Sequence, residues 1–280
     1  IAAVKKKETR GIGKKSKACR FFTAMEFEQI VALIEQQEQI SDIDKLRFQA
    51  WLKFQAHLIA RNDCTSKVFK KKLQESHNFP NILTIQMSWS KNVSEERDCP
   101  KQVLLGSMNR KWCVLLGLSL FLEKWIRDGE GATSQWLLCD GTADSTATAD
   151  VQEAEAKKFK SRFGKLIYSI VTSSEFNIDS STPGKLGTHS IRKFATTFAA
   201  STGVSLGKCG KRGRWKKVNL GEVDMYADTQ LVWPDVEVAC ALCHGGPCIY
   251  KATDGSGVTN EWLEREVFPG ITSMFGPAVG

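Results

Sequence analysis

One stretch of this chain alternates between apolar and polar side chains at every residue. The apolar members are Leu83, Ile85, Met87 and Trp89, and the polar members are Thr84, Gln86, Ser88 and Ser90. A period of two predicts a strand with one buried face. A polar turn over residues 92–98 and an apolar run over 103–105 predict a second strand. Together the two strands predict an antiparallel hairpin.

Elsewhere the apolar residues recur at helical spacing. We expect helices near 24–34 (capped by Thr23), 44–61 and 111–127, and one from an N-cap at Thr188 to about Gly203. Asp150 and Glu153 resemble a capping box for a further helix, whose apolar face runs from Phe159 to Ile170. The helix at 44–61 is apolar over a wide arc, so we expect it to be central. The predicted fold class is mainly α with a small antiparallel β-hairpin or sheet.

The positive charge is concentrated in two regions. The chain has 280 residues and a formal net charge of +8. Residues 1–20 carry eight Lys or Arg against Glu8, and residues 189–217 carry eight with no Asp or Glu. Such focused charge indicates a polyanionic partner, by default nucleic acid, although a solvated lysine-rich surface is the alternative. Beyond Arg192, the DNA-contacting candidates in the second region are Lys193, Lys208, Lys211, Arg212, Arg214, Lys216 and Lys217.

Cysteine content and hydropathy indicate the cellular compartment in which the protein is expected. Nine cysteines at irregular spacing, without a signal peptide, indicate free thiols in a reducing compartment. The longest apolar run, residues 114–122, is too short to span a bilayer, so we expect no membrane partner. We expect the nucleus if the source is eukaryotic, and otherwise the cytoplasm.

Groups suited to phosphate chemistry follow one another between residues 188 and 228. His189 and Arg192 are three residues apart, about 60° on a helix, so both can serve one site. Trp215 lies inside the basic run. Tyr226, one of three tyrosines, follows it. A basic surface with a histidine and a tyrosine beside it combines phosphate binding with proton transfer and a nucleophile.

The order of these elements resembles the catalytic domain of tyrosine recombinases and phage-type integrases. It comprises a helix with an arginine, a hairpin with a lysine, and then the segments HSIRK, RW and MYAD, over roughly residues 21–230. The tryptophan and its surroundings are more similar to eukaryotic mobile-element recombinases. The family acts on double-stranded DNA without metal or cofactor, so the resemblance implies DNA recombination or integration. It also implies a homo-oligomer, a dimer or tetramer, on DNA.

The resemblance implies a role for each matching residue. Tyr226 would attack the scissile phosphate and form a 3′-phosphotyrosyl link, and Arg61 and Arg192 would clamp the phosphate oxygens. His189 would assist proton transfer, the Trp215 indole would hydrogen-bond the phosphate, and Lys91 would protonate the leaving 5′ oxygen. Two of these assignments have alternatives. Lys101 also lies near the hairpin, and Arg61 could instead be an arginine at a helix C-terminus.

Other interpretations concern the rest of the chain. Residues 1–20 are expected to be a basic arm that follows an upstream DNA-clamping domain, and residues 231–280 an extension of unknown role. Cys64 stands where the family usually has an acidic residue, which favours an inactive DNA-binding protein of the same fold. Cys240, Cys243, His244 and Cys248 could bind zinc, although we expect small buried cysteines instead.

Overall fold

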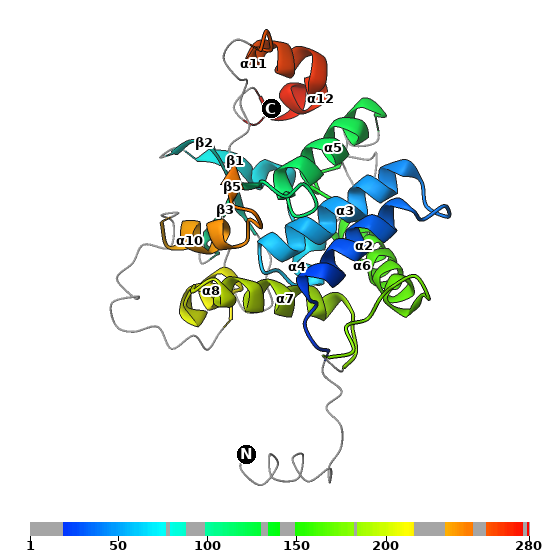
Figure 1. The fold of residues 1–280 in the computed structure, drawn as a ribbon. Coiled ribbons are helices and arrows are strands. Elements are labelled where there is room, and N and C mark those ends of the chain that lie inside the picture. The colour runs from blue at the N-terminus through cyan, green and yellow to red at the C-terminus, as the bar shows by residue number, and fades with distance from the viewer. Residues whose placement is uncertain are drawn as a thin grey trace, which may run out of the picture.

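Helices pack around a central helix, α3, with a small antiparallel sheet beside them (Figure 1). The computed structural model describes residues 19–76, 79–87, 99–129, 134–140, 149–181, 184–215, 233–248, 256–276 and 279. The helices are α2 (Ala24–Glu35), α3 (Asp42–His57), α4 (Asn62–Ser66), α5 (Val114–Arg127), α6 (Ala149–Thr172), α7 (Thr188–Ser201), α8 (Leu206–Arg212), α10 (Trp233–Ala241), α11 (Asn260–Trp262) and α12 (Pro269–Phe275), with a 3₁₀ turn η1 (Lys70–Lys72) and a π-helical turn η3 (Leu263–Val267). None of the helices described is long and apolar enough to cross a membrane.

Helix α3 lies at the centre, as its wide apolar arc predicts. Phe48, Trp51, Leu52 and Phe54 are all buried, and the helix packs against α2, α5 and α7. Each such side chain contributes roughly 1.5–3 kcal/mol through burial. The helix ends at His57, four positions before the predicted end. The chain then turns through Ile59, whose φ is +47°, a left-handed conformation that a β-branched residue rarely adopts.

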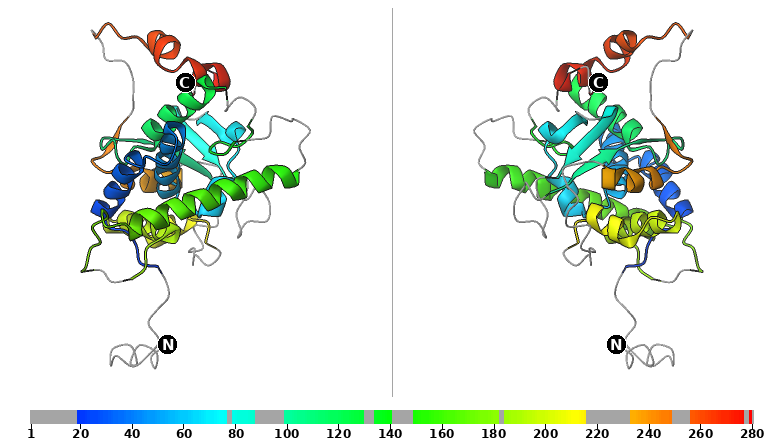
Figure 2. Two further views of the ribbon diagram at one scale, coloured as in Figure 1. Left: turned by 90° about the vertical axis from the view of Figure 1, so that its right-hand side faces the viewer. Right: turned by 90° about the vertical axis from the view of Figure 1, so that its left-hand side faces the viewer.

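The sheet contains the predicted hairpin and one further strand. Strands β2 (Phe79–Gln86) and β3 (Lys101–Leu104) pair antiparallel, and β1 (Leu73–Ser76) pairs with the other edge of β2 (Figure 2). Ile85 on β2 and Met87 just after it are buried, as predicted, but Thr84 on the predicted polar face is buried as well. The four-residue strand β1 follows a run of three lysines and carries too short an alternation to be predicted.

Local capping explains where two helices begin. Thr23 and Glu26 form a reciprocal capping box at α2, with N–H···O distances of 3.2 and 2.9 Å, so the predicted cap is confirmed. At α7 the predicted cap is wrong by one residue, because Gly187 is the N-cap and Thr188 is the first helical residue. The Ser190 hydroxyl, 3.1 Å away, accepts a hydrogen bond from the Gly187 N–H and thereby sets this start.

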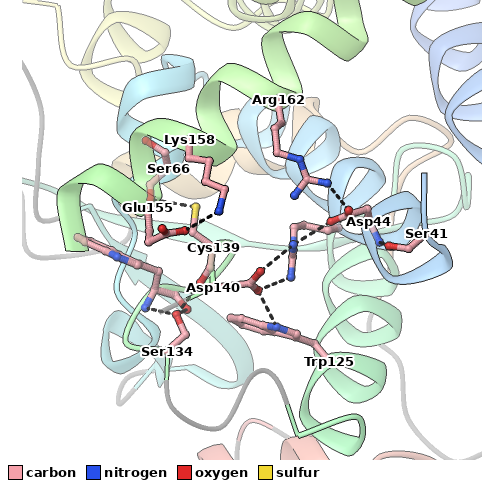
Figure 3. A network of polar contacts seen from close by, with 12 residues as sticks. Ser41, Asp44, Ser66, Trp125, Ser134, Cys139, Asp140, Glu155, Lys158 and Arg162 are labelled. Atoms are coloured by element: carbon pink, nitrogen blue, oxygen red, sulfur yellow. Dashed lines mark hydrogen bonds and ion pairs between the residues drawn. The ribbon is translucent and has the colours of Figure 1, made fainter. Parts of the chain in front are cut away.

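A buried polar network connects α3, α5 and α6 to the segment 134–140 (Figure 3). The Asp140 carboxylate accepts hydrogen bonds from Arg47, at 2.5 Å, and from the Trp125 indole N–H, at 3.0 Å. Asp44 bonds both Arg47, at 2.8 Å, and Arg162. Arg47 is 2% exposed, and each of its two terminal nitrogens has a carboxylate partner. The network therefore stabilises the packing of α3, α5 and α6 against residues 134–140.

The described parts of the C-terminal region pack on the rest of the domain. Helix α10 lies against β3 and α8, and β5 (Pro247–Cys248) pairs with β4 (Gly106–Ser107). Helix α12 packs on α5, where the Glu123 carboxylate accepts hydrogen bonds from two backbone N–H groups of α12, at 3.2 and 3.0 Å. Residues 233–248 thus complete the surroundings of β3. The predicted basic arm at 1–20 lies, except for its last two residues, outside the described residues.

Candidate functional site

Arg192 is a buried cation, and one of its guanidinium nitrogens has no hydrogen-bond partner. It lies on α7 and is 6% exposed. Its Nη2 donates a hydrogen bond to the Gly213 carbonyl, and its guanidinium carbon lies 4.0 Å from the centroid of the Trp215 ring. Its Nη1 is buried and has no hydrogen-bond partner. A buried donor without a partner costs about 1–3 kcal/mol or more when charged, so this nitrogen favours an incoming anion.

The turn after α8 brings Trp215 onto Arg192. The Trp215 N–H bonds the Gly210 carbonyl at 3.1 Å, which closes the turn. The indole lies against Gly213, where an added Cβ would be 2.1 Å from the indole Cζ3. Trp215 itself remains 37% exposed. Residues 213–215 therefore form a cradle for Arg192, and any side chain at position 213 would displace the indole.

Arg61 also has a buried guanidinium nitrogen without a hydrogen-bond partner. It is the N-cap residue of α4, in an extended conformation with φ −83° and ψ 150°. The alternative of a helix C-terminal arginine is wrong, because α3 has already ended at His57. The Nη1 atom of Arg61 is buried without a hydrogen-bond partner, like that of Arg192. The left-handed Ile59 two residues earlier is the sharp turn that separates α3 from α4.

The charges of Arg61 and Arg214 act on Arg192, and we call these three residues the arginine cluster. Burial, and after it the positive charges of Arg61 and Arg214, together lower the pKa of Arg192 to about 9. Cys64, buried on α4, acts on Arg192 in the opposite direction. The folded protein therefore holds several cations close together at a cost. A bound anion would relieve that cost, since each shift of one pKa unit corresponds to about 1.4 kcal/mol.

Gln102 connects the two arginine-bearing segments. It lies on β3 and is fully buried. Its Nε2 donates to the Leu58 carbonyl at 3.3 Å and to the Arg212 carbonyl at 3.1 Å, and its Oε1 accepts from Arg214 Nη1. It therefore joins the end of α3, which leads to Arg61, to the end of α8. Sequence reasoning missed Gln102, although its alternation with Leu104 would have placed it on the inner face of the sheet.

Two arginines that the charge pattern assigned to a DNA-contacting surface lie inside the protein. Arg212 is 1% exposed, and its guanidinium bonds the His57 carbonyl at 2.8 Å, the Val103 carbonyl at 2.9 Å and the Asp235 carboxylate. Because all three of its nitrogens are engaged, the assignment is wrong for Arg212. Arg214 is 5% exposed, with φ +56°, and turns inward to Gln102. It belongs to the buried cluster rather than to an outer surface.

The other predicted residues divide into described and undescribed ones. His189 is exposed, one helical turn before Arg192. Lys193 is exposed and bonds the Cys19 carbonyl, Lys208 pairs with Glu237, and Lys211 is half-buried. Lys91, Lys216, Lys217 and Tyr226 lie outside the described residues. Among the described residues, Trp215 lies on Arg192, the charge of Arg61 acts on Arg192, and Gln102 bonds Arg214.

The cysteine–histidine group after the tyrosine has structural contacts. The Cys243 thiol donates to the Ala239 carbonyl at 3.2 Å. His244 stacks on Trp112, with ring centroids 4.7 Å apart, and lies 3.0 Å from the side-chain nitrogen of Asn109. Within the described part of the chain, no three His, Cys, Asp or Glu side chains form a group that could hold a metal ion. These contacts give no support to the zinc interpretation.

Comparison with known proteins places the fold. No protein-family model matches the sequence, and no curated protein matches it. Among solved structures, FLP recombinase in a Holliday junction complex is 16% identical, with a TM-score of 0.55 over 90% of this chain and 60% of that chain. XerH site-specific recombinase bound to difH is 14% identical in both its pre-cleavage and post-cleavage complexes. The pre-cleavage complex has a TM-score of 0.48 over 74% of this chain and 51% of that chain. The post-cleavage complex with palindromic difH has a TM-score of 0.49 over 75% and 50%.

The likeness to FLP shows the fold of a tyrosine recombinase catalytic domain, in agreement with the mainly helical structure and its small sheet. The chain spans 50–60% of the length of the solved structures that it matches.

Proposed function

We propose that this domain breaks and rejoins DNA strands through a covalent phosphotyrosyl intermediate. One observation carries the proposal: Arg61 and Arg192, from different elements, each keep a buried guanidinium nitrogen without a hydrogen-bond partner. Trp215 lies beside Arg192. Two guanidinium groups with unpartnered nitrogens suit a phosphodiester, whose two non-bridging oxygens accept hydrogen bonds from Arg.

The arginine cluster suits the transition state better than the ground state. When a nucleophile attacks a phosphodiester, negative charge builds up on the non-bridging oxygens. Donors that are already fixed in a buried site bind that charge without further reorganisation. The cradle of Gly213 and Trp215 and the Gln102 bridge hold Arg192 and Arg61 in this way.

The remaining steps follow from the family resemblance. The Tyr226 phenolic oxygen bonds to the scissile phosphorus, and the bond from phosphorus to the 5′ oxygen breaks. His189 assists removal of the phenolic proton, and Lys91 gives a proton to the leaving 5′ oxygen. The number of phosphoester bonds is unchanged, so attack by a 5′ hydroxyl of another strand reseals the DNA without a metal ion or nucleotide.

The partners belong to the proposal as well. The similar FLP recombinase structure is a complex with a Holliday junction. For this chain we propose double-stranded DNA as substrate, a dimer or tetramer on that DNA, and site-specific recombination or integration by the whole protein. Assignment to a mobile element, and to the nucleus of a eukaryote, rests on the sequence resemblance.

Cys64 supports a second candidate, an inactive DNA-binding protein of the same fold. Cys64 is 1% exposed and lies within electrostatic reach of Arg192, at the position where the family has an acid. With a cysteine at this position, the carboxylate that the family has there is missing beside the arginines. In this candidate the arginines still bind phosphate, but Tyr226 has no function.

A nicked suicide duplex distinguishes the two candidates. The protein is incubated with it, and covalent protein–DNA adducts are separated on a denaturing gel. We expect an adduct with the unaltered chain, none with Tyr226→Phe, and a rate about 10²–10³-fold lower with Arg192→Ala. Arg265→Ala, which removes an exposed arginine on η3, is the matched control and should leave the rate unchanged.

The absence of adduct on every duplex, with binding retained in Tyr226→Phe, would favour the inactive DNA-binding protein. An adduct that survives Tyr226→Phe would contradict the assignment of the nucleophile.

A further inference from the structure

A basic hollow lies on the outer face of the sheet. It has a volume of about 320 Å³ and is lined by Lys71, Lys72, Gln74, Thr84, Gln86 and Lys101. Register explains the grouping, because Gln74 pairs with Thr84 and Gln86 pairs with Lys101, and paired residues point to the same face. Lys71 and Lys72 of the turn η1, directly before β1, also line the hollow. We call these six residues the lysine hollow.

The lining indicates the kind of ligand. Three of the six residues carry an ammonium group, two carry an amide and one carries a hydroxyl, so the lining described has no aromatic or aliphatic side chain. Sites for small organic ligands are mostly apolar with a few polar groups. Several ammonium groups instead suit a ligand with repeated negative charges. The sugar–phosphate backbone of DNA is such a ligand, and it is bound without contacts to the bases.

The position of the lysine hollow indicates which strand it would bind. Lys101 and Gln102 are neighbours on β3, so their side chains point to opposite faces of the sheet. Gln102 bonds Arg214 on the inner side, towards the arginine cluster, whereas Lys101 lines the hollow on the outer side. The hollow also lies at the end of the sheet from which residues 87–100 connect β2 to β3, because Gln86↔Lys101 is the last register pair there.

The dimensions of DNA fit this arrangement. The major groove of B-DNA is about 12 Å wide and admits a two-stranded β-ribbon. Strands β2 and β3 therefore fit between two backbones, with Gln102 and Arg214 on the inner side of the sheet and the lysine hollow on the outer side. Helix α10 covers only the other part of this outer face, through the contact between Val103 and Ala239.

We propose that the lysine hollow binds the phosphate backbone of the DNA strand opposite the one held by Arg61 and Arg192. This inference rests on the proposed function. It adds a second phosphate site, on another face of the domain, that grips the uncleaved strand. It also explains why Lys71, Lys72 and Lys101 are gathered from η1 and β3, although the chemistry at the arginines does not need them.

Salt dependence of DNA binding tests the proposal. The Tyr226→Phe chain and its variant with Lys71→Ala, Lys72→Ala and Lys101→Ala are titrated onto a labelled duplex at several salt concentrations. Each lost phosphate contact reduces the slope of log K against log salt by about 0.9, so three contacts predict a loss of about 2.7. With single-stranded DNA of the same length the two proteins should have equal slopes, because no opposite strand is present.

Two further variants control for charge and folding. Replacement of the exposed Lys157, Lys165 and Lys185 by alanine removes the same amount of charge elsewhere and should preserve most of the slope of log K against log salt. Replacement of residues 71, 72 and 101 by arginine keeps the charge in the hollow and should give the slope of the parent chain. An equal loss from both alanine triples, or an unchanged slope in the hollow triple, would overturn the proposal while the proposed function stands. Failure of the parent chain to bind any duplex would overturn both.

Discussion

Replacement of Gly213 by alanine is the sharpest test of the site geometry. Its backbone, with φ −76° and ψ −6°, is one that alanine readily adopts, at the C-cap of α8. By backbone preference alone, Gly→Ala at such a position stabilises a protein by about 0.4–1 kcal/mol. The surroundings predict the opposite sign. The added Cβ would lie 2.1, 2.5 and 2.8 Å from three carbons of the Trp215 indole.

The size of the clash gives the expected magnitude. Carbon atoms make ordinary contact at about 3.5 Å, so an indole carbon now 2.1 Å from the new Cβ must move by about 1.4 Å. The ring then leaves its place over Arg192, which costs about 0.5–2 kcal/mol of cation–π energy. With the strain of overpacking, we expect a net loss of about 1–3 kcal/mol in the free energy of unfolding. The rate of adduct formation should fall about 10²-fold, since a shift of about 1 Å at an active site can have that effect.

Chemical denaturation and the suicide-duplex assay measure the two effects. The control is Gly164→Ala in the middle of α6, where an added Cβ meets no atom within 4 Å. It should gain about 0.5–1 kcal/mol and leave the cleavage rate unchanged. If Gly213→Ala were as stable as the parent and cleaved DNA within twofold of its rate, the cradle described for Arg192 would be wrong.

Three further predictions concern the supports of the site. Gln102→Leu leaves Arg214 and two buried carbonyls without their amide partner, and should lower the free energy of unfolding by about 3 kcal/mol or more in denaturant titrations. Asp235→Asn breaks the buried ion pair with Arg212 and should cost about 3–5 kcal/mol by the same measurement. Burial, and then the charge of Arg212, lowers the pKa of His57 well below 6.5. Below about pH 6.5, His57 binds a proton in the unfolded chain but not in the folded chain. The free energy of unfolding should therefore fall as the pH drops, by up to about 1.4 kcal/mol per pH unit. His57→Gln should flatten this dependence.

Each of these has a matched control on the surface. Gln74→Leu, at an exposed position of β1, should cost less than about 0.5 kcal/mol. Glu237→Gln breaks the half-exposed pair with Lys208 and should cost less than about 1 kcal/mol. His189→Gln, at an exposed position, is the control for His57→Gln. Equal effects in a variant and its control would contradict the role given to the buried residue.

The sequence by itself determined the elements that depend on local patterns. Alternation over residues 83–87 was enough to identify a strand with a buried face, because side chains on a strand point to opposite sides in turn. Helical spacing identified the central α3, and the Thr23 cap identified the start of α2. The order of Arg61, the hairpin, His189, Arg192 and Trp215 was also readable, since order along a chain needs no coordinates.

Only the tertiary structure decided which cations are available to a ligand. Arg192, Arg212 and Arg214 look alike in a basic run, yet Arg212 is fully bonded inside the protein, Arg214 is tied to Gln102, and Arg192 keeps an open nitrogen. The partners that make this difference, Asp235, Gln102 and Val103, come from distant parts of the chain. Burial and hydrogen bonding depend on such long-range contacts, and no pattern within a segment of sequence contains them.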